Sequence, residues 1–193
     1  MSRKDRRIIL VAQCLVNPYC RVHVLGQNFP LSRELMNYLM EKRVGVIQYL
    51  CPETSAQGLM RNPQGRQQYD NVFFRDHCKQ MLKGPMLMVK EFLRNNYRLT
   101  CFLGLENSPT CSIKWGRHKT NKHQMETAEP VEGSDSEESS IRGIMAEILE
   151  EELAAENIKV PFLEFPAKSD PDSEKRKEFW LKLQKAVAPD ASY

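Results

Sequence analysis

The stretch "RIILVAQC" at residues 7–14 is a continuous run of β-branched and aliphatic side chains that ends in a cysteine. Such a run is typical of a strand buried on both faces, as in a parallel sheet covered by helices. Two later stretches have the same character, "VGVIQYLC" at 44–51 and "RLTCFLGLE" at 98–106. "KVPFLEF" at 159–165 predicts a fourth strand, and its Pro161 indicates a sheet edge or an early bend.

Apolar residues at helical spacing lie between these strands. Residues 35, 36, 39 and 40 predict a helix that Ser32 caps. Residues 71–83 and 85–97 predict two further helices, the second opened by Pro85, and one apolar stripe predicts a helix over 140–156. Strand and helix therefore alternate. The pattern predicts an α/β fold, a three-layer Rossmann-like sandwich with a mostly parallel sheet of at least four strands.

Length and composition predict a single domain over residues 1–193, with a mobile polar loop at 116–139 and a C-terminal helix at 170–188. The net charge of +3 is too small to indicate nucleic-acid binding, and the basic residues 114–123 are followed closely by an acidic run. Polar residues interrupt the N-terminal apolar stretch early, and no run approaches the roughly 18 apolar residues of a membrane span. We expect a cytoplasmic protein with no membrane partner.

Three of the six cysteines, Cys14, Cys51 and Cys111, follow three different predicted strands. The carboxyl ends of parallel strands meet at one edge of a sheet, where ligands bind in α/β proteins. Core filling does not explain three thiols at this edge, whereas Cys101, inside a strand, and Cys78, on a helix, have core positions. The position of Cys20 leaves its assignment open. In a reducing compartment, cysteines outside the core are more often metal ligands or catalytic groups.

The chemistry of these thiols has more than one interpretation at this point. A catalytic zinc would need a histidine from the set His23, His118 and His123, and the sequence has no CxxC knuckle. An iron–sulfur cluster suits widely separated single cysteines, and three ligands would leave one iron open. Glu53 and Ser108 accompany the cysteines, as an acid or base and as a positioning hydroxyl, although both also fit turn or cap positions. Glu106 is a weaker candidate for the proton transfer.

The segments "ILVAQCLVNPYC", "CPE" and "GLENSPTC" resemble the thiouracil desulfidase (TudS-like) family, over roughly residues 7–165. That family has Cys-Leu after the first strand, Cys-Pro-Glu after the second and Ser-Pro-Ser-Cys after the third. The chain departs from the family in "CRVHV" at 20–24, in Thr110 and in Ser112, and it has Gly58 where paired glycines are usual. These departures change the pocket walls and leave the ligand positions intact.

The resemblance implies a [4Fe–4S] cluster held by Cys14, Cys51 and Cys111, with one open iron. It also implies a non-redox desulfuration of a thiolated pyrimidine, a small molecule, with Glu53 activating water and Ser108 holding the ring or the proton path. Nucleic acid would matter only as a source of thiolated nucleosides. Two alternatives stay open: an iron–sulfur protein that binds or senses, and a zinc-binding module.

Overall fold

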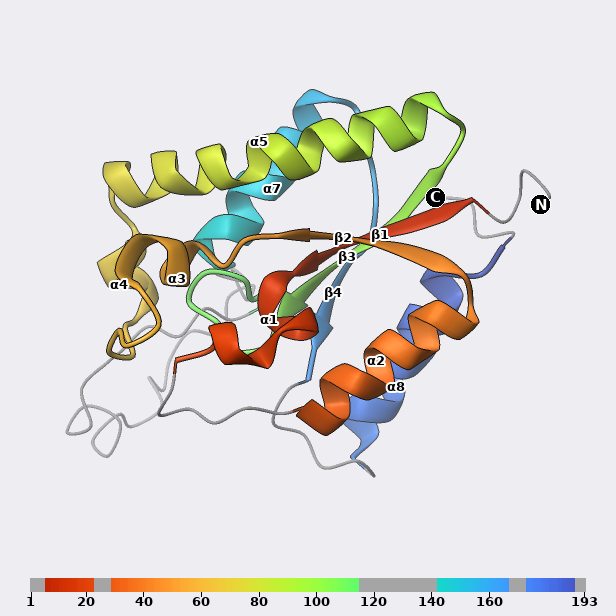
Figure 1. Cartoon of the computed structure of the whole chain (residues 1–193), viewed down its shortest axis with the longest axis horizontal. Helices are drawn as coiled ribbons and strands as arrows, with labels where there is room; N and C mark the ends of the chain where they lie inside the picture. The colour runs from red at the N-terminus through yellow and green to blue at the C-terminus, as the bar shows by residue number, and fades with distance from the viewer. Residues whose placement is uncertain (1–5, 23–28, 115–141, 167–172, 190–193) are drawn as a thin grey trace, which may run out of the picture.

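The structure is a computed structural model that describes residues 6–22, 29–114, 142–166 and 173–189. Its sheet contains β1 (Arg7–Ala12), β2 (Val44–Tyr49), β3 (Arg98–Leu105) and β4 (Phe162–Phe165). The strand order is β2-β1-β3-β4, and every neighbouring pair is parallel. Helices cover the sheet (Figure 1). The predicted α/β fold with a parallel sheet of at least four strands is confirmed.

Two helix layers enclose the sheet. Helices α5 (Val72–Arg94) and α7 (Ile144–Ala155) lie on one face, and α2 (Phe29–Glu41) and α8 (Glu174–Ala186) lie on the other (Figure 1). In the second layer, the rings of Tyr38 and Trp180 pack edge to face with centroids 5.3 Å apart. Every residue of β1 is buried, as expected for a central strand covered on both sides.

One helix, α5, replaces the two helices predicted over 71–83 and 85–97, so the prediction of a break at Pro85 is wrong. Asn71 caps its first turn by accepting a hydrogen bond from the backbone N–H of Phe74. A buried stripe runs past Pro85 without interruption and keeps both halves packed on the core, which outweighs the loss of one backbone hydrogen bond at the proline. The stripe consists of Phe74, Cys78, Leu82, Met86 and Val89.

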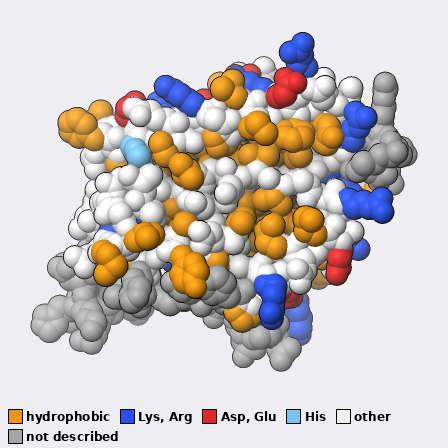
Figure 2. Space-filling model, in the orientation of Figure 1, with side chains coloured by type: hydrophobic (Ala, Val, Ile, Leu, Met, Phe, Trp, Pro, Cys, Tyr) orange, Lys and Arg blue, Asp and Glu red, His pale blue; other side chains and the backbone are white. Residues whose placement is uncertain are grey.

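The outer side of α5 also carries apolar residues. Val72, Phe73, Leu87 and Met88 are exposed, Phe73 by 87%, and Figure 2 shows several apolar groups on this face of the molecule. Apolar content alone therefore does not show which side of α5 faces the sheet. The spacing of the buried stripe does.

Several predicted boundaries shift in the structure. Ser32 lies buried inside α2 and does not cap it, because the helix begins at Phe29. The fourth strand begins only after Pro161, whose carbonyl accepts a hydrogen bond from the Phe102 N–H at 3.0 Å. The C-terminal helix begins at Glu174 with Ser173 as its cap, later than the predicted residue 170.

The polar stretch after β2 contains two short helices, α3 (Pro52–Gln57) and α4 (Arg66–Tyr69). Two more follow β1, namely α1 (Gln13–Val16) and the 3₁₀ helix η2 (Pro18–Cys20). The mobile loop predicted over 116–139 lies outside the described residues. Among the described helices, none combines the length and the apolar character that crossing a membrane requires.

Candidate functional site

The carboxyl edge of the sheet gathers the segments that follow β1, β2 and β3. With the order β2-β1-β3-β4, the crevice between β1 and β3 is the topological switch point at which doubly wound sheets bind ligands. Cys14 lies in α1, Cys51 directly precedes α3, and Cys111 lies in the loop after β3. The strands end earlier than predicted, at Ala12 and Tyr49, because short helices begin there. The Gln13 side chain joins two of these segments by accepting a hydrogen bond from the Cys51 N–H at 2.7 Å.

The thiols of Cys14, Cys51 and Cys111 are free and buried. Burial raises the pKa of Cys14 well above its ordinary value, and the negative charges of Cys111 and Cys51 raise it further. Burial and the charge of Cys51 raise the pKa of Cys111 to about 12. Burial, followed by the charge of Glu53, raises the pKa of Cys51. The three thiols therefore lie within electrostatic range of one another, as their shared sheet edge predicts.

Glu53 lies beside these thiols in the first turn of α3, with 7% of its surface exposed. One carboxylate oxygen accepts a hydrogen bond from Thr110 Oγ1 at 2.8 Å, and the other accepts from Arg61 Nε at 3.2 Å. Each bond joins the carboxylate to a separate segment of the chain. A carboxylate has about four acceptor positions, so each oxygen retains capacity for a further donor such as water.

Arg61 is the most extensively bonded side chain of the site, and sequence reasoning missed it. Its donors reach Glu53 Oε2 at 3.2 Å, Thr54 Oγ1 at 2.9 Å and the carbonyl of Gly58 at 3.2 Å. Its second terminal nitrogen reaches the carbonyl of Cys20 at 2.9 Å and the thiol of Cys51 at 3.9 Å. A guanidinium has five N–H donors, and here five acceptors take them up. Only its place in the polar stretch after "CPE" marked it in the sequence.

Ser108 organises the loop that carries Cys111. Its hydroxyl oxygen accepts hydrogen bonds from the backbone N–H groups of Cys111 at 3.0 Å and Thr110 at 3.3 Å. Ser108 therefore does form the local turn contacts that the sequence offered as its alternative role. Ser108 reaches Glu53 only through Thr110, whose Oγ1 lies 3.2 Å from Ser108 Oγ, 2.8 Å from Glu53 Oε1 and 3.4 Å from Cys111 Sγ. The departure "SPTC" thus marks a site residue that was not singled out.

Two glycines allow the backbone to close tightly around this loop. A Cβ on Gly104 in β3 would lie 2.1 Å from the carbonyl oxygen of Cys111, and one on Gly143 would lie 2.3 Å from the carbonyl carbon of Thr110. The first N–H groups of α7 bind the same loop, because Met145 and Ala146 donate to the Thr110 carbonyl at 2.8 and 3.2 Å. The start of α7 therefore fixes the Cys111 loop, and its donors are occupied.

Two further polar side chains lie near the thiols. The buried hydroxyl of Tyr49 acts on Cys111 as a hydrogen-bond donor, which lowers the pKa of that thiol against the larger rise caused by burial. Nε and Nη2 of Arg21 are buried and have no acceptor within the described residues. The positive charge of Arg21 opposes the rise in the pKa of Cys14, so this guanidinium lies within range of the same thiols.

Thiolates are ligands for soft and borderline metal ions. Three buried thiolates repel one another, and in the metal-free protein the raised pKa values keep the thiols protonated. A cationic centre reverses that balance, since it stabilises thiolates and releases their protons. Over the described ranges, no group of three or more His, Cys, Asp or Glu side chains is gathered as a site for a metal ion. An iron–sulfur cluster differs from a single metal ion in its ligand geometry, because each cysteine binds a different iron atom.

The remaining candidates have other surroundings. Cys101 is fully buried in β3, in keeping with its core assignment. Cys78 is also fully buried, but the charge of Cys111 adds to the effect of burial in raising its pKa, so it lies behind the site. Cys20 is buried beside Cys51, whose charge adds to the effect of burial on the pKa of Cys20. Glu106 forms an ion pair with Lys175. The three candidate zinc-binding histidines lie outside the described residues.

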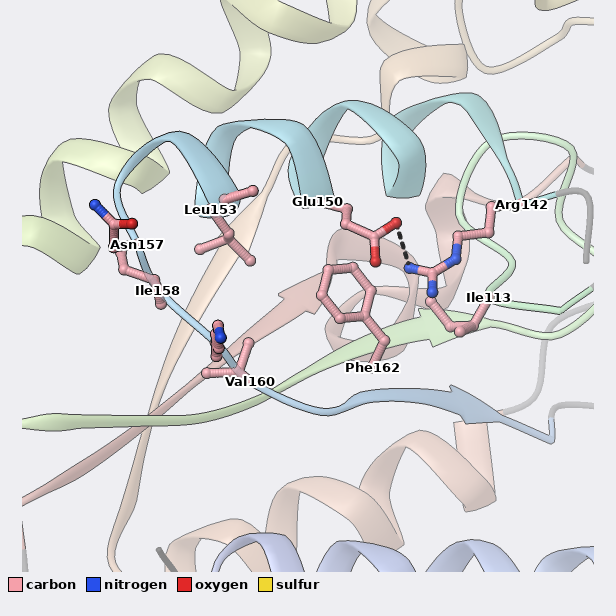
Figure 3. Close-up of a pocket in the computed structure, with 10 residues that line it drawn as sticks. Ile113, Arg142, Glu150, Leu153, Asn157, Ile158, Val160 and Phe162 are labelled. Atoms are coloured by element: carbon pink, nitrogen blue, oxygen red, sulfur yellow. Dashed lines mark ion pairs between the residues drawn. The ribbon is translucent and has the colours of Figure 1, made fainter. Parts of the chain in front are cut away.

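A separate pocket of about 430 Å³ lies between α7 and the β4 side of the sheet (Figure 3). It contains no cysteine and shares Ile113 with the end of the Cys111 loop. Arg142 at its rim pairs with Glu150 at 2.9 Å and lies over the ring of Phe162 at 5.1 Å. Its arginine therefore already has a carboxylate partner, and the chemistry-bearing residues lie at the sheet edge.

Comparison with known proteins gives one curated relative, uncharacterized protein MJ0003 of the archaeon Methanocaldococcus jannaschii. It is 30% identical over 110 residues, which span 57% of this chain and 70% of the relative. No family model matches the chain, and no solved structure matches it.

Proposed function

The chain belongs to the same family as the archaeal MJ0003, and since that relative is named only as uncharacterized, we propose a function from the site itself. The protein is an iron–sulfur enzyme that removes sulfur from a thiolated pyrimidine without net oxidation or reduction and releases sulfide. The substrate is a small thiouracil-type base, a nucleoside or an RNA-derived fragment. The resemblance of the three cysteine segments to thiouracil desulfidases supports this proposal.

Cys14, Cys51 and Cys111 would hold a [4Fe–4S] cluster. When bound through three thiolates, such a cluster supplies an open iron, a Lewis acid with affinity for soft sulfur. Arg61 contacts the Cys51 thiol, and Arg21 lies within range of Cys14, so two positive charges flank the thiolates. This placement offsets part of the negative charge that three buried thiolates introduce.

Glu53 would accept a proton from the attacking water. Arg61 and Thr110 fix its carboxylate from two sides, and both oxygens keep acceptor capacity. A positioned carboxylate of this kind contributes roughly 10²–10⁴-fold to a hydrolytic step. The two hydrogen bonds restrict the carboxylate to one orientation, which is the requirement for proton transfer to a defined atom.

Ser108 and Thr110 would carry the proton path. Thr110 donates to Glu53, so its oxygen is available to accept the Ser108 hydroxyl proton at 3.2 Å. The Thr110 hydroxyl also lies 3.4 Å from Cys111 Sγ. A chain of hydroxyls thus joins the carboxylate to the cluster side of the site. In this proposal Ser108 both forms the turn and begins the chain.

The overall reaction balances without an external oxidant or reductant. One water oxygen replaces the sulfur on the ring carbon, the carbon–sulfur bond breaks, and the two water protons leave with the sulfide. The proposal depends on three free thiols that follow three strand ends, each within electrostatic range of the Glu53 carboxylate.

The test is anaerobic reconstitution with iron and sulfide, followed by incubation with 2-thiouracil and measurement of released sulfide and uracil. We expect brown protein, about four irons per chain, and equal amounts of both products. Glu53→Gln preserves the size of the side chain but exchanges one acceptor oxygen for an amide donor. Its oxygen can still accept from Arg61 and its NH2 can donate to Thr110, so this variant should keep its iron and lose at least about 100-fold in rate.

Other outcomes distinguish the alternatives. A full cluster without sulfide release from any thiolated pyrimidine would favour a binding or sensing protein. Colourless protein that carries zinc after anaerobic purification would overturn both iron–sulfur interpretations.

A further inference from the structure

Two guanidinium groups flank the buried thiols, and they differ in how their donors are used. All five N–H donors of Arg61 have acceptors within the site. In Arg21, Nε and Nη2 are buried without any hydrogen-bond partner in the described structure. Arg61 therefore holds the site together, whereas Arg21 has donors to spare.

The vacant donors of Arg21 form one edge of its guanidinium. Nε–H and one N–H of Nη2 point in parallel from the same side of the planar group, the arrangement that binds two lone pairs at once. Its backbone is also fixed, because the Arg21 N–H donates to the Pro18 carbonyl at 3.1 Å. The preceding carbonyl, of Cys20, accepts from both Arg61 and Thr54 at 2.9 Å.

Leaving buried donors of a cation unpaired costs free energy, and the cost is recovered when an acceptor arrives. The acceptor lies close to the site, since Arg21 directly follows Cys20, whose carbonyl lies 3.9 Å from the Cys51 thiol. Among the described residues no protein group supplies it, and the Glu53 carboxylate binds Arg61 and Thr110 instead. A ligand that enters the site can supply this acceptor.

We propose that Arg21 determines substrate specificity by donating from Nε and Nη2 to an oxo oxygen on the ring that carries the sulfur. This inference rests on the proposed desulfuration and narrows its substrate class to thiolated pyrimidines that keep a ring oxo group. A carbonyl oxygen has two lone pairs and can accept both donors. A ring without that oxygen leaves the donors unpaired and binds poorly.

Two pairs of ligands that differ by this oxygen test the proposal. The substrates are 2-thiouracil and pyrimidine-2-thione, and the corresponding products are uracil and pyrimidin-2-one. For Arg21→Lys and Arg21→Gln we expect kcat/KM for 2-thiouracil to fall roughly 10–100-fold, with little change for pyrimidine-2-thione. In Arg21→Lys, which keeps the positive charge beside the thiolates, iron content and the thermal unfolding midpoint should match the wild type.

A second measurement does not depend on turnover. Equilibrium dialysis before cluster reconstitution should show that wild-type protein binds uracil more tightly than pyrimidin-2-one, and that both Arg21 variants lose this preference. Arg61→Lys is the matched comparison: an ammonium has three donors where five are used, so this variant should lose iron and stability.

The results separate the two proposals. If wild-type protein with a full cluster releases no sulfide but its preference for uracil depends on Arg21, the desulfuration is wrong and the recognition role stands. If the Arg21 variants lose iron, or slow both substrates equally, Arg21 only balances the thiolate charge and the specificity role is overturned. Equal binding of uracil and pyrimidin-2-one by the wild type also overturns it.

Discussion

The two ends of the sheet use polar side chains in different ways. At the amino edge, arginines bind backbone carbonyls: Arg7 reaches those of Val187 and Lys42, and Arg98 reaches that of Ala188. At the carboxyl edge, side chains bind backbone groups and also one another, as in Glu53 with Thr110 and Arg61.

The two kinds of contact have different effects: bonds to carbonyls stabilise the fold, and bonds between side chains fix the orientation of site residues. An arginine on a carbonyl ties distant parts of the chain to the sheet, as Arg7 does through its two terminal nitrogens. Buried side-chain networks are a minority among protein hydrogen bonds, and they are costly unless satisfied. Within the described residues, this network also leaves Nε and Nη2 of Arg21 buried without partners.

Removing a thiol gives the largest expected effect. Cys14→Ala, Cys51→Ala and Cys111→Ala should each abolish the visible absorption of the reconstituted protein, because each removes one of three proposed ligands. Cys101→Ala is the matched control, since this cysteine is equally buried but lies inside β3. It should retain the colour and lose about 1–2 kcal/mol of unfolding free energy. Loss of colour in the control alone would contradict the division between site and core.

A methyl group at the carboxyl edge should have the next largest effect. In Gly143→Ala the new Cβ meets the Thr110 backbone at 2.3 Å, so we expect a loss of about 3 kcal/mol and a lower iron content. Gly45→Ala at the amino edge is the control, because its Cβ meets the Ile8 side chain at 3.3 Å and the Arg7 carbonyl oxygen at an ordinary contact distance of 3.6 Å. Urea unfolding should show a change below about 1 kcal/mol there. Equal losses in both variants would contradict the tight closure around Cys111.

Breaking the amino edge should reduce stability without affecting the chemistry. Arg7→Met keeps most of the aliphatic side chain but leaves the carbonyls of Val187 and Lys42 without this donor. We expect a loss of about 2 kcal/mol in urea unfolding, with iron content and sulfide release per folded molecule unchanged. A fall in specific activity at full iron content would show that the two edges are coupled.

A surface network outside both edges should matter least. The hydrogen bond from Arg75 lowers the pKa of Asp70, and Arg66 contributes to the same shift. A lowered folded pKa gives stability above the unfolded value of about 3.9, which is lost as the pH falls through the folded value. Asp70→Asn should therefore cost about 0.5 kcal/mol at pH 7 and progressively less in acid. Thermal unfolding at pH 7 and pH 3 checks this, and an equal cost at both pH values would contradict the ion pair.

The strands and the sheet class were predictable because buried parallel strands are continuous apolar runs, as in residues 7–12. The continuity of α5 was not predictable from the sequence. A proline indicates a local helix start, whereas the burial of Leu82 and Met86 on either side of it depends on packing against the rest of the protein. Likewise Ser32 fits a cap by type, but the actual start of α2 places it inside the helix.

The cysteines of the site could be found because each follows a strand, and the topology brings strand ends together. Arg61 and Thr110 could not be found in the same way. Their roles depend on contacts with residues 8 and 57 positions away, respectively, and neither lies in a position that the strand pattern marks. Arg21 follows Cys20, whose role the sequence left open. What marks Arg21 as a site candidate is that two of its buried nitrogens have no partner in the described residues, which the sequence does not reveal.

The Gly143 N–H donates to the carbonyl of Ser112 at 3.0 Å, so the chain leaves the sheet edge and returns to it at points one hydrogen bond apart. The cost of closing a connection between two such points grows only slowly with its length, by about 0.6 kcal/mol for each doubling. Selection can therefore lengthen, shorten or replace the connecting segment while the cysteine before it stays in place. For protein engineering, the same junction is an insertion point for a reporter domain. Among homologues, length differences should concentrate there.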